Sequence, residues 1–404
     1  MRSLSSRPRL SAVHLLGAAA FVSVAVAIVL ILTSSGTSKR VVASSSRSPV
    51  SLASGGTPHP HAVNTGLPTT RTQPPPRPAA PRLGIAKSLG QLIVARFAGT
   101  VPSSSMLSAI KAGRVGGIIL FSDNTAGGVA GTAALVSQLQ AAARQGGNPG
   151  LLIMTDQEGG LVKRLPGPPD ESASQMSNPA VAAQQGAATA SLLRSAGVNV
   201  DLAPVADVSD VDGFMTQEDR TFGSNPAVVA RAACAFADAL SAGGVAYTLK
   251  HFPGLGDAYS STDNEPVSVP ASRRLLYTDE GAYRQCGGGN LALVMVSSAS
   301  YPNLTGSTPA VLSPAAYAAL HADGVDPVTI SDDFQAPGLA GQTSPALRAI
   351  NAGLDLVMYA ETEAASASAY AELYQDAQDG ALSAGRIRAA AAKVLALKRS
   401  LQLG

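Results

Sequence analysis

The first 83 residues of this 404-residue chain contain no aspartate and no glutamate, although they hold nine of its 29 lysines and arginines. The other 321 residues therefore carry twenty basic residues against all 27 acidic ones, a net charge of −7. The formal charge of +2 for the whole chain is thus a cancellation between two unlike parts. Because a mildly acidic body presents no basic face to a phosphate backbone, a nucleic-acid partner is disfavoured.

Cysteine and histidine are also scarce, with two and five residues in the whole chain. They form no cluster of the kind that binds zinc, so we expect no metal centre. Gly254-Leu255-Gly256 lacks the third glycine of a dinucleotide fingerprint, and residues 207–213 lack the spacing of a calcium loop. No nucleophile-elbow serine motif is present either. The sequence therefore predicts no cofactor and does not support a Ser–His–Asp hydrolase.

The N-terminal segment predicts export. Arg2, Arg7 and Arg9 precede an apolar run from Val13 to Leu32, with no cysteine nearby to accept a lipid. A run of about 20 residues is long for a signal-peptide core and long enough to span a bilayer. The arginines keep the N-terminus cytoplasmic and send the rest across the membrane. We predict that residues 1–33 are a signal anchor or a cleaved signal peptide, and a buried core helix is the alternative.

Residues 34–86 are rich in Ser, Thr and Pro and include Pro74-Pro75-Pro76-Arg77-Pro78. Such a stretch buries too little apolar surface to offset chain entropy, and its prolines keep it extended. We predict a disordered linker that tethers the body outside the cytoplasm. The body is then extracytoplasmic, either anchored to the membrane through residues 13–32 or secreted.

The body, residues 87–404, alternates short aliphatic runs with longer Ala-rich segments of helical spacing, such as 129–144, 181–195, 226–242 and 386–401. The eight aliphatic runs are 91–97, 117–121, 151–155, 198–202, 245–249, 291–296, 328–331 and 355–359. Strands that alternate with helices form a parallel sheet covered by helices, and eight such units favour a (β/α)8 TIM barrel of the α/β class. An open doubly wound sheet is the alternative, although it lacks a glycine fingerprint after its first strand.

Polar residues follow three of these runs. Asp156 comes after the third, Lys250-His251 after the fifth and Asp332-Asp333 after the seventh. Because the carboxyl ends of barrel strands meet at one face, and reactive residues gather there, we expect these side chains to lie together.

The two cysteines fall on segments expected to form neighbouring outer helices. Cys234 precedes the fifth run and Cys286 precedes the sixth. Export permits a disulfide between them, and two buried free thiols are the alternative.

Four motifs carry a resemblance to a known family. They are 155–164 (TDQEGGLVKR), 220–224 (RTFGS), 250–257 (KHFPGLGD) and 330–334 (ISDDF). In this order they resemble the N-terminal domain of glycoside hydrolase family 3, in particular the single-domain β-N-acetylglucosaminidases. Residues 117–124 and 199–207 match further family segments, so the resemblance covers about residues 88–402. It implies a barrel enzyme that needs no cofactor.

The resemblance also implies roles for single residues. Asp332 matches the nucleophile, whereas Asp333 is better suited to capping a following helix. The positions that hold the hydroxyl groups of the terminal sugar match Asp156, Arg164, Arg220, Lys250 and His251. Carboxylates and cations suit this task, and each could otherwise be an ordinary ion-pair partner.

The chain departs from the family pattern at the acid/base position. In the N-acetylglucosaminidase branch an Asp-Ser-His triplet follows the Lys-His motif, but counting on from Lys250 places Ser261-Thr262-Asp263 there. Asp263 can replace the missing histidine if burial or the charge of Asp332 keeps it protonated, and Glu265 is the reserve candidate. A smaller departure is Leu161, where the family often has arginine.

The resemblance thus implies a retaining glycosidase that acts on β-linked N-acetylglucosamine at the non-reducing ends of glycans such as peptidoglycan fragments. We expect a monomer whose partner is a carbohydrate. A sugar-binding wall protein that has lost catalysis is the alternative from a different class. A β-glucosidase or xylosidase is the lesser alternative, because larger family members act on those sugars.

Overall fold

The computed structural model describes residues 83–404, and the account below is confined to them. Eight parallel strands close into a barrel in the order β1-β10-β9-β8-β7-β6-β3-β2. The strands are β1 (Ile93–Ala95), β2 (Gly117–Ile119), β3 (Leu152–Thr155), β6 (Val200–Asp201), β7 (Ala246–Phe252), β8 (Ala292–Val296), β9 (Val328–Asp333) and β10 (Leu356–Met358). All eight expected runs contribute one strand each. The (β/α)8 barrel is confirmed, and the open doubly wound sheet is wrong.

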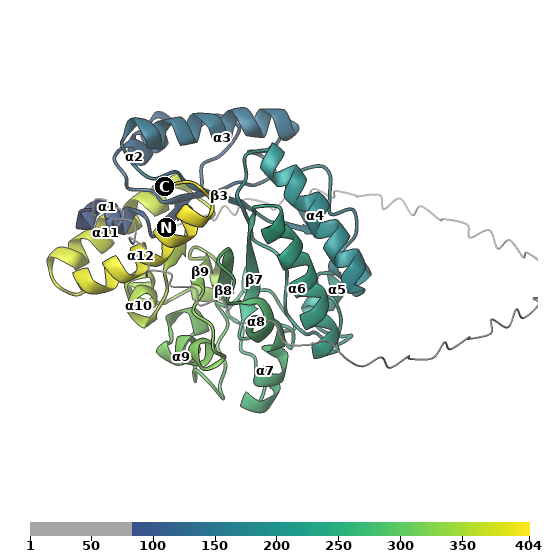
Figure 1. Cartoon of the computed structure of the whole chain (residues 1–404). Helices are drawn as coiled ribbons and strands as arrows, with labels where there is room; N and C mark the ends of the chain where they lie inside the picture. Colours follow the sequence, from purple (N-terminus) through teal and green to yellow (C-terminus); the bar gives the residue numbers. More distant parts are fainter. Residues whose placement is uncertain (1–82) are drawn as a thin grey trace, which may run out of the picture. The chain divides into compact units, whose positions relative to one another are not determined.

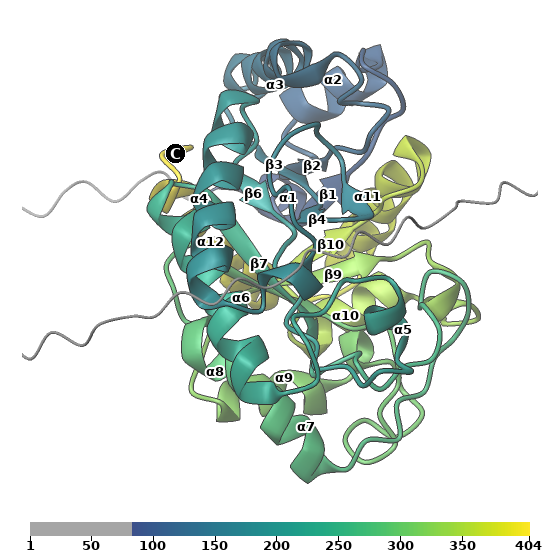
Figure 2. The ribbon, with the colours of Figure 1, turned by 90° about the vertical axis from the view of Figure 1, so that its right-hand side faces the viewer.

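Helices surround the strands on the outside of the barrel, as Figures 1 and 2 show. They are α1 (Ile85–Gly90), α2 (Ser104–Lys111), α3 (Gly128–Gln145), α4 (Pro179–Ser195), α5 (Phe214–Gln217), α6 (Pro226–Ala242), α7 (Arg273–Asp279), α8 (Gly281–Cys286), α9 (Pro314–Ala322), α10 (Pro345–Ala352), α11 (Glu363–Gln378) and α12 (Ala384–Ser400). Between β3 and α4 the chain adds a small antiparallel hairpin, β4 (Gln157–Gly159) and β5 (Val162–Lys163). The four helices expected from their spacing are α3, α4, α6 and α12.

Two of the outer helices, α4 and α6, illustrate why these segments are helical and close-packed. In α6 the Asn225 side chain accepts the backbone N–H groups of Ala227 and Val228, and Pro226 occupies the first turn, where its missing donor costs nothing. In α4, a Cβ at Gly186 would lie 2.6 Å from the carbonyl oxygen of Phe236. Glycine at this position therefore permits the two helices to approach each other.

The interior of the barrel is filled rather than hollow. One cluster of buried apolar side chains draws on all eight strands, often at alternate positions: Val94, Ile119, Leu152, Met154, Val200, Ala246, Leu293, Met295, Val328, Ile330, Leu356 and Met358. Alternation is expected, because successive strand residues face opposite sides of the sheet. A filled interior leaves the face at the carboxyl ends of the strands as the place for a binding site.

The two cysteines lie on α6 and α8, as expected for neighbouring outer helices. A disulfide joins Cys234 and Cys286, with their Cα atoms 5.7 Å apart, so the alternative of two free thiols is wrong. They are separated by 52 positions in the sequence, and the intervening segment includes β7 and the loop that follows it. Cross-linking a loop of this length stabilises a fold by about 4 kcal/mol through the entropy of the unfolded chain.

Two boundaries differ from expectation. Strand β7 continues to Phe252, so Lys250 and His251 belong to the strand instead of following it, and β9 likewise includes Asp332 and Asp333. The predicted anchor and residues 34–82 of the predicted linker lie outside the described residues, and helix α1 begins at Ile85, two residues before the predicted start of the barrel. From residue 83 onward, no helix combines the length and apolar character needed to cross a membrane.

Candidate active site

A cleft of about 470 Å³ opens at the carboxyl ends of the barrel strands. Its lining includes Asp156, Lys250, Asp263 and Asp332, which come from or follow three different strands. Ile119, Met295 and Met358 also line it from the barrel strands. The volume lies in the range of ordinary small-molecule sites. The structure therefore brings together the polar residues that the sequence placed at strand ends.

Buried ion pairs form the floor of the cleft. Lys250 Nζ lies 2.8 Å from Asp156 Oδ1 and 2.7 Å from Glu158 Oε1. Arg220 donates to both oxygens of Glu158, with Nε and Nη2 each at 2.9 Å. Planar two-bond pairing of this kind fixes the guanidinium as well as attracting it. Two carboxylates and two cations thus hold one another in place.

Charge pairing decides the protonation of this floor. Burial opposes ionisation of Glu158, but the positive charges of Arg220 and Lys250 outweigh it and lower the pKa of Glu158 to about 2. Burial likewise opposes the charge on Lys250, and the carboxylates of Asp156 and Glu158 raise its pKa above the ordinary value. Glu158 and Lys250 are therefore both charged at neutral pH.

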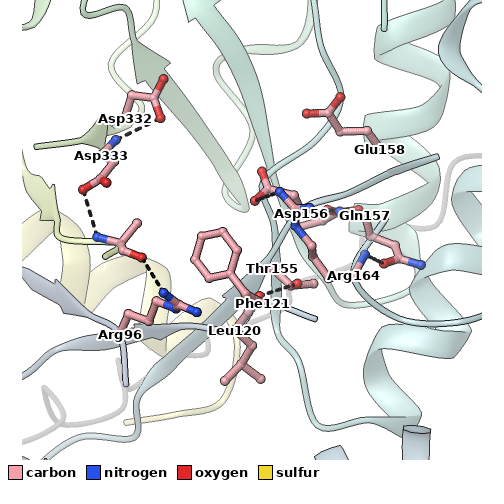
Figure 3. A network of polar contacts seen from close by, with 12 residues as sticks. Arg96, Leu120, Phe121, Thr155, Asp156, Gln157, Glu158, Arg164, Asp332 and Asp333 are labelled. Carbon is pink, nitrogen blue, oxygen red and sulfur yellow. Dashed lines mark hydrogen bonds and ion pairs between the residues drawn. The ribbon is translucent and has the colours of Figure 1, made fainter. Parts of the chain in front are cut away.

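Arg164 directly follows strand β5 of the hairpin and lines the cleft. Its Nη2 lies 3.9 Å from Asp156 Oδ2, a looser pairing than that of Lys250. The guanidinium stacks over the Phe121 ring at 5.2 Å, and Arg96 stacks over the same ring at 4.7 Å. Figure 3 shows Arg164 beside Asp156, with Phe121 in the centre of the view. Leu161, between β4 and β5, is 76% exposed and does not line the cleft.

His251 is held in place by the buried carboxylate of Asp207, which was not among the predicted site residues. Its Nδ1 lies 2.7 Å from Asp207 Oδ2, and the other oxygen of Asp207 accepts the backbone N–H groups of His251 and Leu255. A carboxylate oxygen accepts, so Nδ1 carries the proton. Because His251 lines the cleft, Nε2 is left for a ligand.

Asp332 and Asp333 end strand β9 but make different contacts. Asp332 Oδ1 accepts the backbone N–H of Asp333, and its carboxylate lines the cleft. Asp333 Oδ1 accepts the N–H groups of Gln335 and Ala360. The next helical turn begins at Pro337, so the prediction that Asp333 caps a helix is wrong. Asp333 instead closes a turn and ties β9 to the loop after β10 (Figure 3).

The loop after β7 brings Asp263 to the same cleft. The Ser261 hydroxyl accepts the N–H of Asp263, and Gly338 donates its N–H to the Thr262 carbonyl at 2.8 Å. A Cβ at Gly338 would lie 2.8 Å from that carbonyl oxygen, so the glycine permits the contact. Asp263 is exposed, so of the two alternatives considered for it, burial or the nearby charge of Asp332, burial is wrong. Glu265 is exposed and does not line the cleft.

The negative charge of Asp263 acts on the carboxyl group of Asp332. Burial and the nearby negative charge of Asp263 raise the pKa of Asp332 above its ordinary value, while His251 and Lys250 act in the opposite direction. Burial raises the pKa of Asp333 to about 6. The charge of Asp263, not its burial, thus links it to Asp332.

Three carboxylates of the site were not predicted as site residues: Glu158, Asp201 and Asp207. Glu158 lies two positions after Asp156, and alternate residues of an extended segment share a face, so this signal was present. Asp201 is buried, and its Oδ1 accepts the N–H of Gln157; burial raises its pKa well above the ordinary value. Asp201 and Asp207 both lie in the segment 199–207 that resembles the family, but nothing in the segment indicated which of its residues contribute to the site. Within residues 83–404, no three or more His, Cys, Asp or Glu side chains are arranged to hold a metal ion.

Comparison with known families agrees with this geometry. The profile of the glycosyl hydrolase family 3 N terminal domain matches residues 85–397. The chain belongs to this family, and its barrel, with a polar cleft at the strand ends, is that of a glycosidase. The substrate of such an enzyme is a carbohydrate.

Particular relatives share most of the barrel. An uncharacterized secreted glycosyl hydrolase of Arthroderma benhamiae is 34% identical over 58% of this chain and 69% of its own length. Beta-hexosaminidase LpqI of Mycobacterium tuberculosis is 30% identical over 78% of this chain and 85% of its own. The structure of a family 3 β-N-acetylglucosaminidase from Paenibacillus superposes with a TM-score of 0.73 at 28% identity, covering 80% of this chain. This chain spans 63% of that protein.

Proposed function

We propose that the protein is a retaining glycosidase that removes β-linked N-acetylglucosamine, or a related sugar, from the non-reducing ends of glycans such as peptidoglycan fragments. The observation that carries this proposal is a cleft that the ion-paired side chains of Lys250, Glu158 and Arg220 line together with the carboxylate of Asp332. Such a pocket suits one terminal sugar. The names of the β-hexosaminidase relatives support the choice of sugar.

The floor residues bind the terminal sugar. Asp156, Arg164, Arg220, Lys250 and His251 all line the cleft with charged or hydrogen-bonding atoms. Their fixed positions favour hydroxyl groups in one orientation, and the binding energy can be used to distort the ring at the reacting carbon.

Asp332 attacks the anomeric carbon and forms a covalent glycosyl–enzyme bond as the bond to the leaving oxygen breaks. Asp263, protonated, gives its proton to that oxygen. In the second step Asp263 takes a proton from water, the water oxygen attacks the anomeric carbon, and Asp332 is released. The two inversions at this carbon retain its configuration.

Replacing Asp263 should separate substrates by their need for a proton. We expect Asp263→Ala to lower kcat/KM for an unactivated disaccharide by about 10²- to 10⁴-fold, the usual contribution of a general acid. A dinitrophenyl glycoside, whose leaving group departs unassisted, should lose far less in the first step. Steady-state kinetics on both substrates provide the test. Equal losses on the two, or a larger loss in Glu265→Ala, would assign the proton transfer elsewhere.

A panel of aryl glycosides tests the choice of sugar. We expect the purified chain to hydrolyse 4-nitrophenyl N-acetyl-β-glucosaminide in preference to the β-glucoside and β-xyloside. If the protein binds N-acetylglucosamine yet releases nothing from any activated glycoside, it is a sugar-binding protein that has lost catalysis, and the proposed reaction fails.

We also propose that the barrel acts outside the cytoplasm. The support is the run of residues 13–32 with its flanking arginines, and a relative described as secreted. Residues 1–33 would serve as anchor or signal peptide and residues 34–86 as linker, with the catalytic barrel from residue 87. Fractionation of cells that express the full chain tests this location.

A further inference from the structure

We propose that the mouth of the cleft selects leaving groups that carry an ammonium group and disfavours those that carry a free carboxylate. The inference rests on the proposed function, since it concerns the part of the glycan that is released. The residues that carry it are Glu218, Asp263 and Glu361, which we call the acidic lip. All three line the cleft.

The acidic lip lies where a leaving group would lie. Its members come from three separate segments: Glu218 follows α5, Asp263 follows β7 and Glu361 follows β10. Asp263 and Glu361 are exposed, and the Glu218 side chain is 39% exposed. The floor is closed by contrast, because the side chains of Lys250 and Glu158 are each 3% exposed. A terminal sugar held on the floor therefore directs the rest of the glycan past the lip.

The cleft carries an excess of negative charge that its own cations do not balance. Seven carboxylates line it, namely Asp156, Glu158, Glu218, Asp263, Asp332, Asp333 and Glu361, against the three cations Arg164, Arg220 and Lys250. In the reactive form proposed above Asp263 carries a proton. With a second proton on Asp333, the five carboxylates Asp156, Glu158, Glu218, Asp332 and Glu361 still face three cations. The sign of the excess therefore does not depend on those two protons.

The cations are committed to the floor. Lys250 and Arg220 pair with Glu158, and Arg164 approaches Asp156. Arg220 also reaches Glu218, but at 3.4 Å and with its other two nitrogens engaged. Within residues 83–404 neither Asp263 nor Glu361 takes part in an ion pair. Through Glu361 and the loosely paired Glu218, the lip therefore presents negative charge to the leaving group even while Asp263 holds the proton that it donates.

An ammonium group at the lip gains from this charge, whereas a carboxylate is repelled. The ammonium can come from two sources: an amino sugar that lacks its N-acetyl group, or a peptide amine attached to the released sugar. An N-acetylated sugar without peptide is neutral and gives the reference rate. A substrate whose released sugar carries an ether-linked substituent with a free carboxylate should be cleaved most slowly.

Three disaccharides test the inference, each with N-acetylglucosamine β-1,4-linked to a different released sugar: glucosamine, N-acetylglucosamine, or N-acetylmuramic acid with its carboxylate free. At pH 6, where the amine is protonated, we expect kcat/KM for the ammonium substrate to exceed the neutral one by roughly three- to tenfold, and the carboxylate substrate to fall below it. Raising the salt concentration should shrink both differences. A further pair of substrates distinguishes the two sources of the amine. Both carry a lysine-containing peptide on the released sugar, and the lysine side chain is free in one and acetylated in the other.

Matched variants assign the effect to the lip. The double variant Glu218→Gln/Glu361→Gln should bring the ammonium-to-neutral ratio to within about twofold of unity, since each surface charge pair contributes modestly. Glu372→Gln, which removes one charge from an exposed position on α11, should keep the wild-type ratio. A ratio near one in the wild type, or an unchanged ratio in the double variant, overturns the inference while cleavage of the neutral disaccharide leaves the proposed function standing. If none of the disaccharides is cleaved, both fail.

Discussion

Asp332→Ala should lower kcat/KM for an aryl N-acetyl-β-glucosaminide by about 10⁴-fold or more, while leaving the fold intact. Removing a nucleophile removes the covalent route itself, and losses of this size follow when a group that forms the intermediate is deleted. In the described part of the chain the Asp332 side chain has one local hydrogen bond, from the part-buried N–H of Asp333, so its loss affects a single donor in the neighbouring residue. Steady-state kinetics, with a thermal melt to show that the variant is folded, measure the effect.

Asp333→Asn is the matched control for this experiment. It removes the same charge one residue away, but an asparagine Oδ1 can still accept the N–H groups of Gln335 and Ala360. We expect its kcat/KM to stay within about tenfold of the wild type, because Asp333 acts through backbone contacts. If Asp333→Asn lowers kcat/KM as much as Asp332→Ala does, the assignment of Asp332 as the nucleophile is contradicted.

Glu158→Gln should destabilise the protein at neutral pH by about 3 kcal/mol and lower its melting temperature by several degrees. The pKa of Glu158 is about 2 in the folded protein and 4.5 ordinarily, and each unit corresponds to about 1.4 kcal/mol. Because the folded-state pKa is lowered, this stability is fully present above about pH 4.5. It is lost as the pH falls toward 2.

The wild type and Glu158→Gln should therefore differ most at pH 6–7 and converge as the pH drops through 4. Thermal melts of both proteins across this range measure the difference, and Glu372→Gln on the surface of α11 provides a charge-matched control. Glu158→Gln also removes the ion-pair partner of Arg220 and one of the two ion-pair partners of Lys250. Because both cations then hold the sugar less firmly, we also expect a higher KM for the glycoside substrate. Equal melting temperatures at pH 7 would show that the buried pairs add nothing to stability, and the floor would then be less tightly held than we describe.

The barrel could be predicted because each of its strands is a separate aliphatic run. Residues 151–154 and 291–296 are apolar throughout, as is typical of strands buried on both faces, and both lie largely within strands. The boundary of β7 could not be predicted in the same way. Lys250 and His251 break the apolar pattern, yet they continue the strand because Asp156, Glu158 and Asp207 pair with their side chains.

Partners distant in the sequence are the part of the site that local patterns leave out. Asp207 and His251 lie 44 positions apart, and only the fold brings them to 2.7 Å. Lys398 gives a second example away from the cleft. It stands in the last turn of α12, where a lysine usually faces water, but it is fully buried and donates to Gln91 Oε1 and the Gly116 carbonyl. Burial lowers its pKa to about 7.

The missing histidine shows both the reach and the limit of counting along a motif. The spacing from Lys250 placed Asp263 at the acid/base position, and the structure puts it at the cleft with Asp332. The spacing could not predict that Asp263 is exposed. The loop that carries Asp263 is held by a hydrogen bond between Thr262 and Gly338, which are distant in the sequence. Glu265 lies only two residues further along the chain but is not one of the residues that line the cleft.

Trapping the covalent intermediate tests the central claim most directly. The protein is incubated with a fluorinated N-acetylglucosamine analogue that forms the glycosyl–enzyme bond faster than water breaks it, then digested and mapped by mass spectrometry. We predict one adduct, on the peptide that contains Asp332, and none in Asp332→Ala. An adduct on a different residue, or hydrolysis of N-acetyl-β-glucosaminides with inversion at the anomeric carbon, would contradict the assignment of Asp332 as nucleophile.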